Sequence, residues 1–294
     1  MGILLGLATA LCWGSADLLA RFATRSIGTF RTMLYMQLTG LVLMTAAMHW
    51  LGGWGHLADG SGLRPWMWGI LVGVLNASST LALYRSFEIG KMSVVAPISA
   101  GYPALTMVLS AMTGERLTVP RFAGVVLIIV GVIVVARGEE VPGDANPLEQ
   151  ETRAEKTHLG VGWALMSGAG FGFMFWLLGI RVVPLLGSAP SVWLIRLTSV
   201  VTTALAILLV RRPMALPGKG AKRWILGVGI LDTSAYVLNN FGMQHEQVSV
   251  VSVLASLYGA VTVGLAATIL GEKISRAQWM GVGAIFAGIV LISR

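Results

Sequence analysis

Residues 114–137 read GERLTVPRFAGVVLIIVGVIVVAR, and residues 271–294 read GEKISRAQWMGVGAIFAGIVLISR. Each stretch is a Gly-Glu-basic turn followed by a mostly apolar run that ends on arginine. A run of this length can cross the hydrocarbon core of a bilayer as a helix. Because the same pattern recurs in the middle and at the end of the chain, the sequence predicts a tandem duplication.

The duplication extends over most of the chain. We place the first repeat at residues 1–137 and the second at residues 159–294. Residues 138–158 carry six acidic residues and two prolines, which predicts a hydrophilic linker between the repeats. The matched positions are Trp13-Gly14 with Phe171-Gly172, Gln37-Leu38-Thr39 with Arg196-Leu197-Thr198, Trp68 with Trp224, Asn76 with Asp232, Ser93-Val94-Val95 with Ser249-Val250-Val251, and Tyr102 with Tyr258.

The composition is that of an integral membrane protein. Of 294 residues, 55% are hydrophobic and 12% are charged, and the mean hydropathy is +0.78. Because unpaired backbone groups are costly in lipid and no alternating strand pattern is present, the apolar runs are expected to be helices. We predict an all-α membrane protein with ten transmembrane helices, near residues 3–22, 32–51, 66–86, 92–113, 120–137, 159–180, 190–210, 223–243, 248–270 and 277–293.

The two halves are expected to be inverted relative to each other. Each half has five spans, and an odd number makes the second half enter the membrane from the opposite side. Inverted repeats are typical of secondary transporters, because two similar halves can expose a central site to each side in turn.

Basic residues indicate how the chain is oriented. Fifteen Lys and Arg residues fall on one side of the predicted membrane and five on the side of the N-terminus. This bias predicts a multi-pass protein of a bacterial-type plasma membrane with both termini outside. Loop charge beside anionic headgroups also explains the net charge of +8, so no nucleic-acid partner is expected. The first apolar run is interpreted as a retained helix.

The chain resembles the drug/metabolite transporter superfamily, and in particular its EamA-like family. The residues that carry the resemblance span nearly the whole chain: Leu11-Cys12-Trp13-Gly14-Ser15, Gly90-Lys91-Met92-Ser93-Val94-Val95-Ala96-Pro97, Pro103, Gly114-Glu115-Arg116-Leu117 and Gly124-Val125-Val126-Leu127-Ile128. The sequence departs from the common pattern at Ala16-Asp17. The resemblance implies ten helices, a central cavity lined mainly by the third, fourth, eighth and ninth spans, and export of amino acids, related metabolites or drugs.

Ionisable residues inside spans usually serve a transport pathway or a partner. Asp232, in the eighth span, is a candidate for substrate binding or proton coupling, and the alternative is a structural bond between helices. Arg196, in the seventh span, could receive a substrate carboxylate, neutralise Asp232, or extend to the interface. Asp17 lies four residues before Arg21, which is ion-pair spacing. The small multidrug members of the superfamily suggest proton coupling for Asp17 instead.

Uncharged polar residues at related positions of both halves complete the predicted substrate site. Aromatic side chains with one polar tip suit a cavity that binds weakly and releases, although duplicated packing residues would give the same pattern. The candidates are Gln37, Asn76, Tyr84, Tyr102, Tyr236 and Tyr258. We interpret the two turns at Glu115 and Glu272 as structural, with each glutamate at a helix terminus.

The motif content argues against an enzyme. The sequence has no His-Glu-x-x-His, no Gly-x-Ser-x-Gly and no phosphate-binding glycine loop. We expect no cofactor and no metal. The function hypothesis is a secondary transporter that exports a small amphipathic metabolite, an amino acid or a relative, by alternating access. The alternatives are a multidrug or cation exporter and a membrane receptor or scaffold. The oligomeric state is left open.

Overall fold

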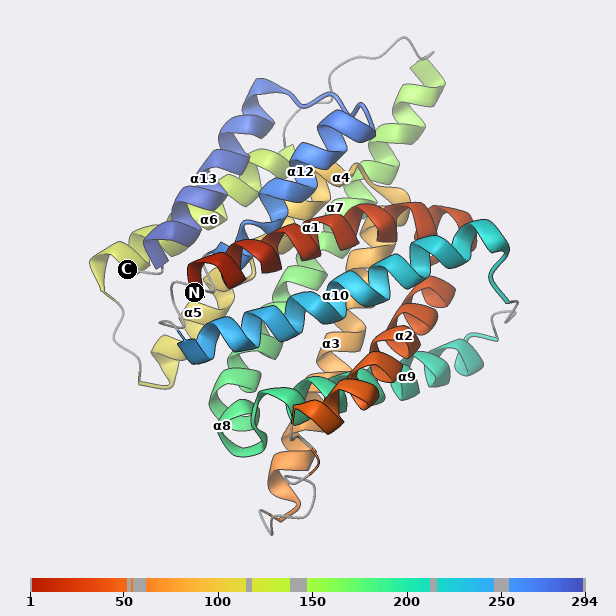
Figure 1. The fold of residues 1–294 in the computed structure, drawn as a ribbon. Helices are drawn as coiled ribbons and strands as arrows, with labels where there is room; N and C mark the ends of the chain where they lie inside the picture. Colours follow the sequence, from red (N-terminus) through yellow and green to blue (C-terminus); the bar gives the residue numbers. More distant parts are fainter. Residues whose placement is uncertain are drawn as a thin grey trace.

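The computed structural model describes residues 2–51, 54, 62–114, 118–137, 147–211, 216–245 and 254–292, with the backbone alone for residues 2–3, 147–157, 219, 240 and 243–245. All regular structure in these ranges is helical (Figure 1). The first half contains α1 (Gly2–Ile27), α2 (Thr29–Trp50), α3 (Arg64–Ile89), α4 (Met92–Ala100), α5 (Pro103–Met112) and α6 (Val119–Arg137). The second half contains α7 (Pro147–Leu177), the π-helical turn η2 (Leu178–Val182), α8 (Val183–Leu186), α9 (Ser188–Leu209), α10 (Lys219–His245), α12 (Tyr258–Ile269) and α13 (Arg276–Ile292).

These elements form the ten predicted helices. The fourth span is divided into α4 and α5 at Gly101 and Tyr102, just before Pro103, which has no N–H to continue the helical bonding. The sixth span begins earlier than predicted, since α7 takes up residues 147–158 of the expected linker. The remainder of the linker, the Glu115 turn and the start of the ninth span lie outside the described residues.

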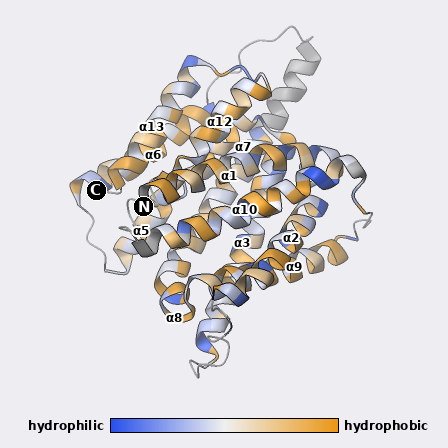
Figure 2. Cartoon of the chain, viewed as in Figure 1, coloured by the Kyte–Doolittle hydropathy of each residue, from blue (hydrophilic) through white to orange (hydrophobic). Residues whose placement is uncertain are grey.

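Five helical segments of the described chain are long and apolar enough to cross a membrane: Arg64–Ile89, Met92–Met112, Val119–Arg137, His158–Leu186 and Ser188–Leu209. Large apolar side chains such as Phe122, Leu205 and Ile230 lie exposed on the outer surface of the bundle. Figure 2 shows that hydrophobic residues cover the helices along their length and that strongly hydrophilic residues gather near helix ends. An apolar exterior of this kind matches a lipid environment.

The helix contacts repeat in pairs. Helix α1 of the first half packs along α10 of the second half. Helix α7, the counterpart of α1 in the second half, packs along α3 of the first half (Figure 1). Likewise α1 contacts α12 while α7 contacts α4 and α5, and α10 contacts α2 while α3 contacts α9. The remaining large contacts, α2 with α9, α4 with α12 and α6 with α13, join each helix to its own counterpart. This exchange of partners is the relation expected of two halves around a pseudo-two-fold axis.

Glycines at the helix crossings follow the same relation. A Cβ atom at Gly73 would lie 2.5 Å from Thr198, and one at the matched Gly229 would lie 2.5 Å from Thr39. The two threonines are themselves matched positions in the sequence. The other crossings of this kind pair Gly14 against Val261 with Gly172 against Leu105, and Gly124 against Gly288 with Gly131 against Gly281. Small residues let helices approach closely in a membrane, so the duplication has kept the contact points themselves.

The close approach of α6 and α13 predicts a difference in stability between two glycine variants. A Cβ atom at Gly131 would lie 2.7 Å from the carbonyl oxygen of Gly281, which is backbone and cannot move away alone. We expect Gly131→Ala to lower the free energy of unfolding by about 1–3 kcal/mol, as overpacking does. Gly283→Ala is the control, because nothing lies within 4 Å of a Cβ there. Thermal unfolding in detergent measures both, and equal transitions for the two variants would contradict the close approach.

Candidate functional site

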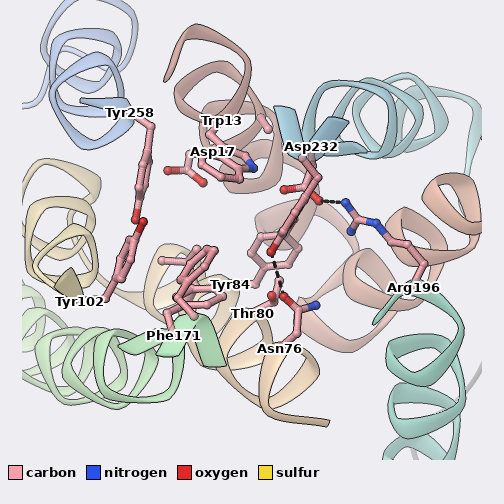
Figure 3. A pocket seen from close by; sticks show the side chains of 14 residues that line it. Trp13, Asp17, Asn76, Thr80, Tyr84, Tyr102, Phe171, Arg196, Asp232 and Tyr258 are labelled. Carbon is pink, nitrogen blue, oxygen red and sulfur yellow. Dashed lines mark hydrogen bonds and ion pairs between the residues drawn. The ribbon is translucent and has the colours of Figure 1, made fainter. Parts of the chain in front are cut away.

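A cavity lies inside the bundle where the two halves meet (Figure 3). The centre of a water molecule can reach about 60 Å³ of this cavity. The third, fourth, eighth and ninth spans contribute to its wall as expected, and the first, sixth and seventh do so as well. The lining residues are Trp13, Ala16, Asp17, Asn76, Thr80, Leu83, Tyr84, Tyr102, Phe171, Phe175, Arg196, Asp232, Tyr236 and Tyr258.

Most of this lining comes in pairs related by the duplication. At the offsets found in the sequence, five lining residues of the first half match five of the second. The pairs are Trp13 with Phe171, Asp17 with Phe175, Asn76 with Asp232, Thr80 with Tyr236, and Tyr102 with Tyr258. The cavity therefore surrounds the pseudo-two-fold axis, which is where an inverted-repeat transporter places its substrate.

Arg196 and Asp232 form an ion pair at the edge of the cavity. A guanidinium nitrogen of Arg196 lies 2.5 Å from a carboxylate oxygen of Asp232, and a second donates to Gln37 Oε1 at 2.8 Å. Arg196 is only 1% exposed, so the predicted alternative in which it extends to the interface is wrong. The guanidinium also lies over the ring of Tyr236, 5.0 Å from its centroid. Gln37 does not line the cavity, but it accepts a hydrogen bond from Arg196, which does.

The space for Arg196 comes from a glycine. A Cβ atom at Gly40 would lie 2.6 Å from Thr233 Oγ1 and 3.0 Å from Nε of Arg196. The position matched to Gly40 in the second half is Ser199. The first half therefore has the smaller residue where the buried guanidinium passes.

Asn76 connects the two halves through neutral hydrogen bonds. Its amide donates to Ser199 Oγ at 3.1 Å, and its carbonyl oxygen accepts from the hydroxyl of Tyr236 at 3.1 Å. Both partners belong to the second half. Thus Asn76 and Asp232, which were matched in the sequence, both sit in the cavity wall, one in a neutral network and one in an ion pair.

Asp17 points into the cavity (Figure 3) and is not bonded to Arg21. Its carboxylate accepts a hydrogen bond from Thr262 Oγ1 at 2.9 Å. The Arg21 guanidinium instead donates to the carbonyl oxygens of Phe87 and Gly90 and lies 3.3 Å from Glu272. The ion pair offered by the spacing of residues 17 and 21 is therefore not formed.

The remaining predicted residues and several others complete the wall. Tyr84, Tyr102 and Tyr258 also line the cavity, and in Figure 3 the hydroxyl ends of Tyr102 and Tyr258 approach each other. Trp13 packs edge-on against Tyr236 and Tyr258, with ring centroids 5.4 and 5.9 Å apart. Sequence reasoning missed six lining residues, although the matched pair of Trp13 and Phe171 was a signal for two of them. The six are Trp13, Ala16, Thr80, Leu83, Phe171 and Phe175.

Glu272 binds the beginning of α4, which belongs to the other half. Its two carboxylate oxygens accept hydrogen bonds from the backbone N–H groups of Met92 and Ser93, at 3.1 and 2.8 Å. α4 has no side-chain cap of its own, so Glu272 supplies an anion to the positive end of this helix. We call Glu272, Arg21 and the first turn of α4 the Glu272 clamp. Glu272 is thus more than the local helix-terminus residue that the sequence suggested.

Comparison with known proteins assigns the family. The chain matches the EamA-like transporter family over residues 1–137 and 158–294. A solved structure titled only as the crystal structure of a protein covers 99% of this chain and 95% of its own, with a TM-score of 0.66 at 19% identity, which shows the shared fold. An uncharacterized protein of Methanocaldococcus jannaschii is 41% identical over 68 residues, which are 23% of this chain and about half the length of that relative. Members of the family are multi-pass integral membrane transporters and not enzymes. The duplicated helices, the cavity between them and the family match lead to one conclusion: the chain belongs to the EamA-like transporter family.

Proposed function

We propose that this transporter exports a small amphipathic metabolite, an amino acid or a related compound, across the plasma membrane by alternating access. The observation that carries the proposal is the cavity lined by matched residues of both halves. A site on the pseudo-two-fold axis contacts the same two halves whichever side it faces, so it can be offered to each side of the membrane in turn.

Contacts that join the two halves support a moving site. The Glu272 clamp joins α4 of one half to the α12–α13 connection of the other. Breaking and remaking contacts between halves is what domain motions around a ligand require. Because the sequence has no phosphate-binding glycine loop, the energy would come from a gradient.

The chemistry of the wall supports an amphipathic ligand. Aromatic rings offer apolar surface, while Asn76 and Thr80 of α3 and Asp17 of α1 present polar atoms. Small-molecule sites combine a mostly apolar lining with a few polar groups that fix orientation. The cation-exporter alternative gains support from the charge of Asp17, which the next subsection develops.

Counterflow in proteoliposomes tests the function and the site together. Vesicles loaded with a mixed pool of amino acids and amines, read by mass spectrometry, should lose a few compounds selectively relative to protein-free vesicles. Ala16 lines the cavity, so Ala16→Leu fills it and should slow that loss by about tenfold or more, since misfitting volume costs on the order of 1–3 kcal/mol. Ala123→Leu, on the exposed surface of α6, is the matched control. If no compound is lost, or if Ala16→Leu exchanges like the control, the proposed site is wrong.

A further inference from the structure

Three acidic or basic side chains line the cavity, Asp17, Arg196 and Asp232, and the last two neutralise each other. Arg196 is held by Asp232 at 2.5 Å and by Gln37 at 2.8 Å, and it is almost completely buried. A substrate carboxylate that bound this guanidinium would compete with Asp232 for its charge. The positive charge of Arg196 is therefore already paired with Asp232. Asp17 is the remaining acidic group of the wall that a ligand can bind.

Asp17 has no cationic partner among the residues that the structure describes. It is 7% exposed, and the hydrogen bond that reaches it comes from a neutral group, Thr262 Oγ1. That hydroxyl also lies 2.9 Å from the carbonyl oxygen of Tyr258, so its single proton serves two acceptors. Arg21, one turn along the same helix, is occupied by Glu272 and two backbone carbonyls. A buried carboxylate with so little compensation is costly unless a proton or a positive group joins it.

Aromatic rings surround this carboxylate. In Figure 3, Asp17 lies between Trp13 and Tyr258 and points into the cavity, with Tyr102, Tyr84 and Phe171 across from it. Ring faces attract cations through their quadrupole, and Trp does so most strongly. A carboxylate within an aromatic wall therefore favours an ammonium group with an apolar body over an anion or a neutral polyol.

The two halves differ in charge at the position of Asp17. The position matched to Asp17 in the second half is Phe175, which also lines the cavity. Two matched positions of the wall thus differ in charge, with a carboxylate at one and a phenyl ring at the other. A ligand with a charged end and an apolar end would bind in one orientation.

We propose that the cavity selects a monovalent organic amine, whose ammonium group binds Asp17 and whose apolar body packs among the aromatic rings. The inference rests on the proposed transport function and narrows its substrate class. It ranks an amine above the corresponding amino acid, because the extra carboxylate of the amino acid finds the one cation of the described wall already paired.

Three compounds with the same phenyl body test this ranking: 2-phenylethylamine, phenylalanine and 3-phenylpropionate. In counterflow, the amine should exchange about tenfold faster than the amino acid, and the acid should not exchange. Asp17→Asn should slow amine exchange by about 10- to 100-fold, the range for one lost bond to a charged group. Asp17→Glu should restore part of the rate, because it keeps the charge. Glu88→Gln removes a carboxylate that bonds to Arg85 and Thr29 outside the cavity and should leave the rate unchanged.

A binding measurement keeps the test decisive when a variant transports poorly. The amine should raise the unfolding temperature of the wild-type protein and of Asp17→Glu in detergent, and should not raise that of Asp17→Asn. If phenylalanine exchanges and the amine does not, the amine proposal is overturned while the transport function stands. If amine exchange is the same in Asp17→Asn as in wild type, Asp17 is not the selecting group. If none of the three compounds exchanges or stabilises the protein, while other compounds of the mixed pool do exchange, the amine class alone fails. If nothing in the pool exchanges, the proposed function fails with it.

Discussion

Asp232→Asn is expected to lower the free energy of unfolding by about 3–5 kcal/mol, because it leaves the guanidinium of Arg196 buried without its counter-charge. Arg196 is 1% exposed, so little water reaches its guanidinium. Gln37 would remain its hydrogen-bond partner, but a neutral amide oxygen does not offset a full charge. Thermal or denaturant unfolding of purified protein in detergent measures the loss.

The first half supplies the compensating control. Its residues at the positions of Arg196 and Asp232 are Gln37 and Asn76. The double variant Arg196→Gln, Asp232→Asn should therefore recover most of the stability lost in the single variant, since removing both charges of a buried pair costs much less than removing one. A single variant as stable as wild type would show that Arg196 does not depend on Asp232 for its counter-charge. A double variant no better than the single one would show that packing, and not charge, dominates the loss.

Glu272→Ala is expected to open the first turn of α4. The substitution removes a carboxylate that binds the N–H groups of Met92 and Ser93 and also removes the partner of Arg21. Hydrogen bonds to a charged group contribute roughly 1.5–3 kcal/mol each, so amide exchange at residues 92–95 should be about 10- to 100-fold faster. Hydrogen–deuterium exchange of the detergent-solubilised protein, read on a peptide that covers this turn, measures the effect.

The neighbouring residue provides the control for the Glu272 clamp. Lys273 is exposed and has no bond to α4 among the described contacts, so Lys273→Ala should leave exchange at the start of α4 unchanged. Arg21→Ala should produce a smaller increase than Glu272→Ala, because it leaves both N–H bonds in place. Slow exchange in Glu272→Ala would mean that the turn is held by its own helix and that the clamp contributes little.

The charged side chains show how the duplicated halves have diverged. The backbone crossings at Gly14 and Gly172, and at Gly73 and Gly229, are nearly equivalent. The ionisable residues are not, because Asp17, Arg196 and Asp232 are matched by Phe175, Gln37 and Asn76. Close packing tolerates little change in volume, whereas a cavity wall can exchange a polar group for an aromatic one. The divergence therefore lies where a ligand is expected to bind.

The sequence by itself determined the ten apolar runs, the duplication and the family. Lipid requires apolar helices of a minimum length, and a repeat is visible residue by residue, so both signals are local in the chain. It also indicated much of the cavity wall, because Asn76 with Asp232 and Tyr102 with Tyr258 occupy matched positions.

Only the tertiary structure decided which polar groups meet. The spacing of Asp17 and Arg21 permits an ion pair, yet two carbonyl groups and Glu272, which are distant in the chain, hold Arg21 instead. Arg196 could have extended to the interface, but the packing of α2 against α9 places Gln37 and the space beside Gly40 around it. Hydrogen bonds and ion pairs act over a few ångströms, so the pairing of charged residues depends on which helices pack together, and the pattern within a single helix does not contain that information.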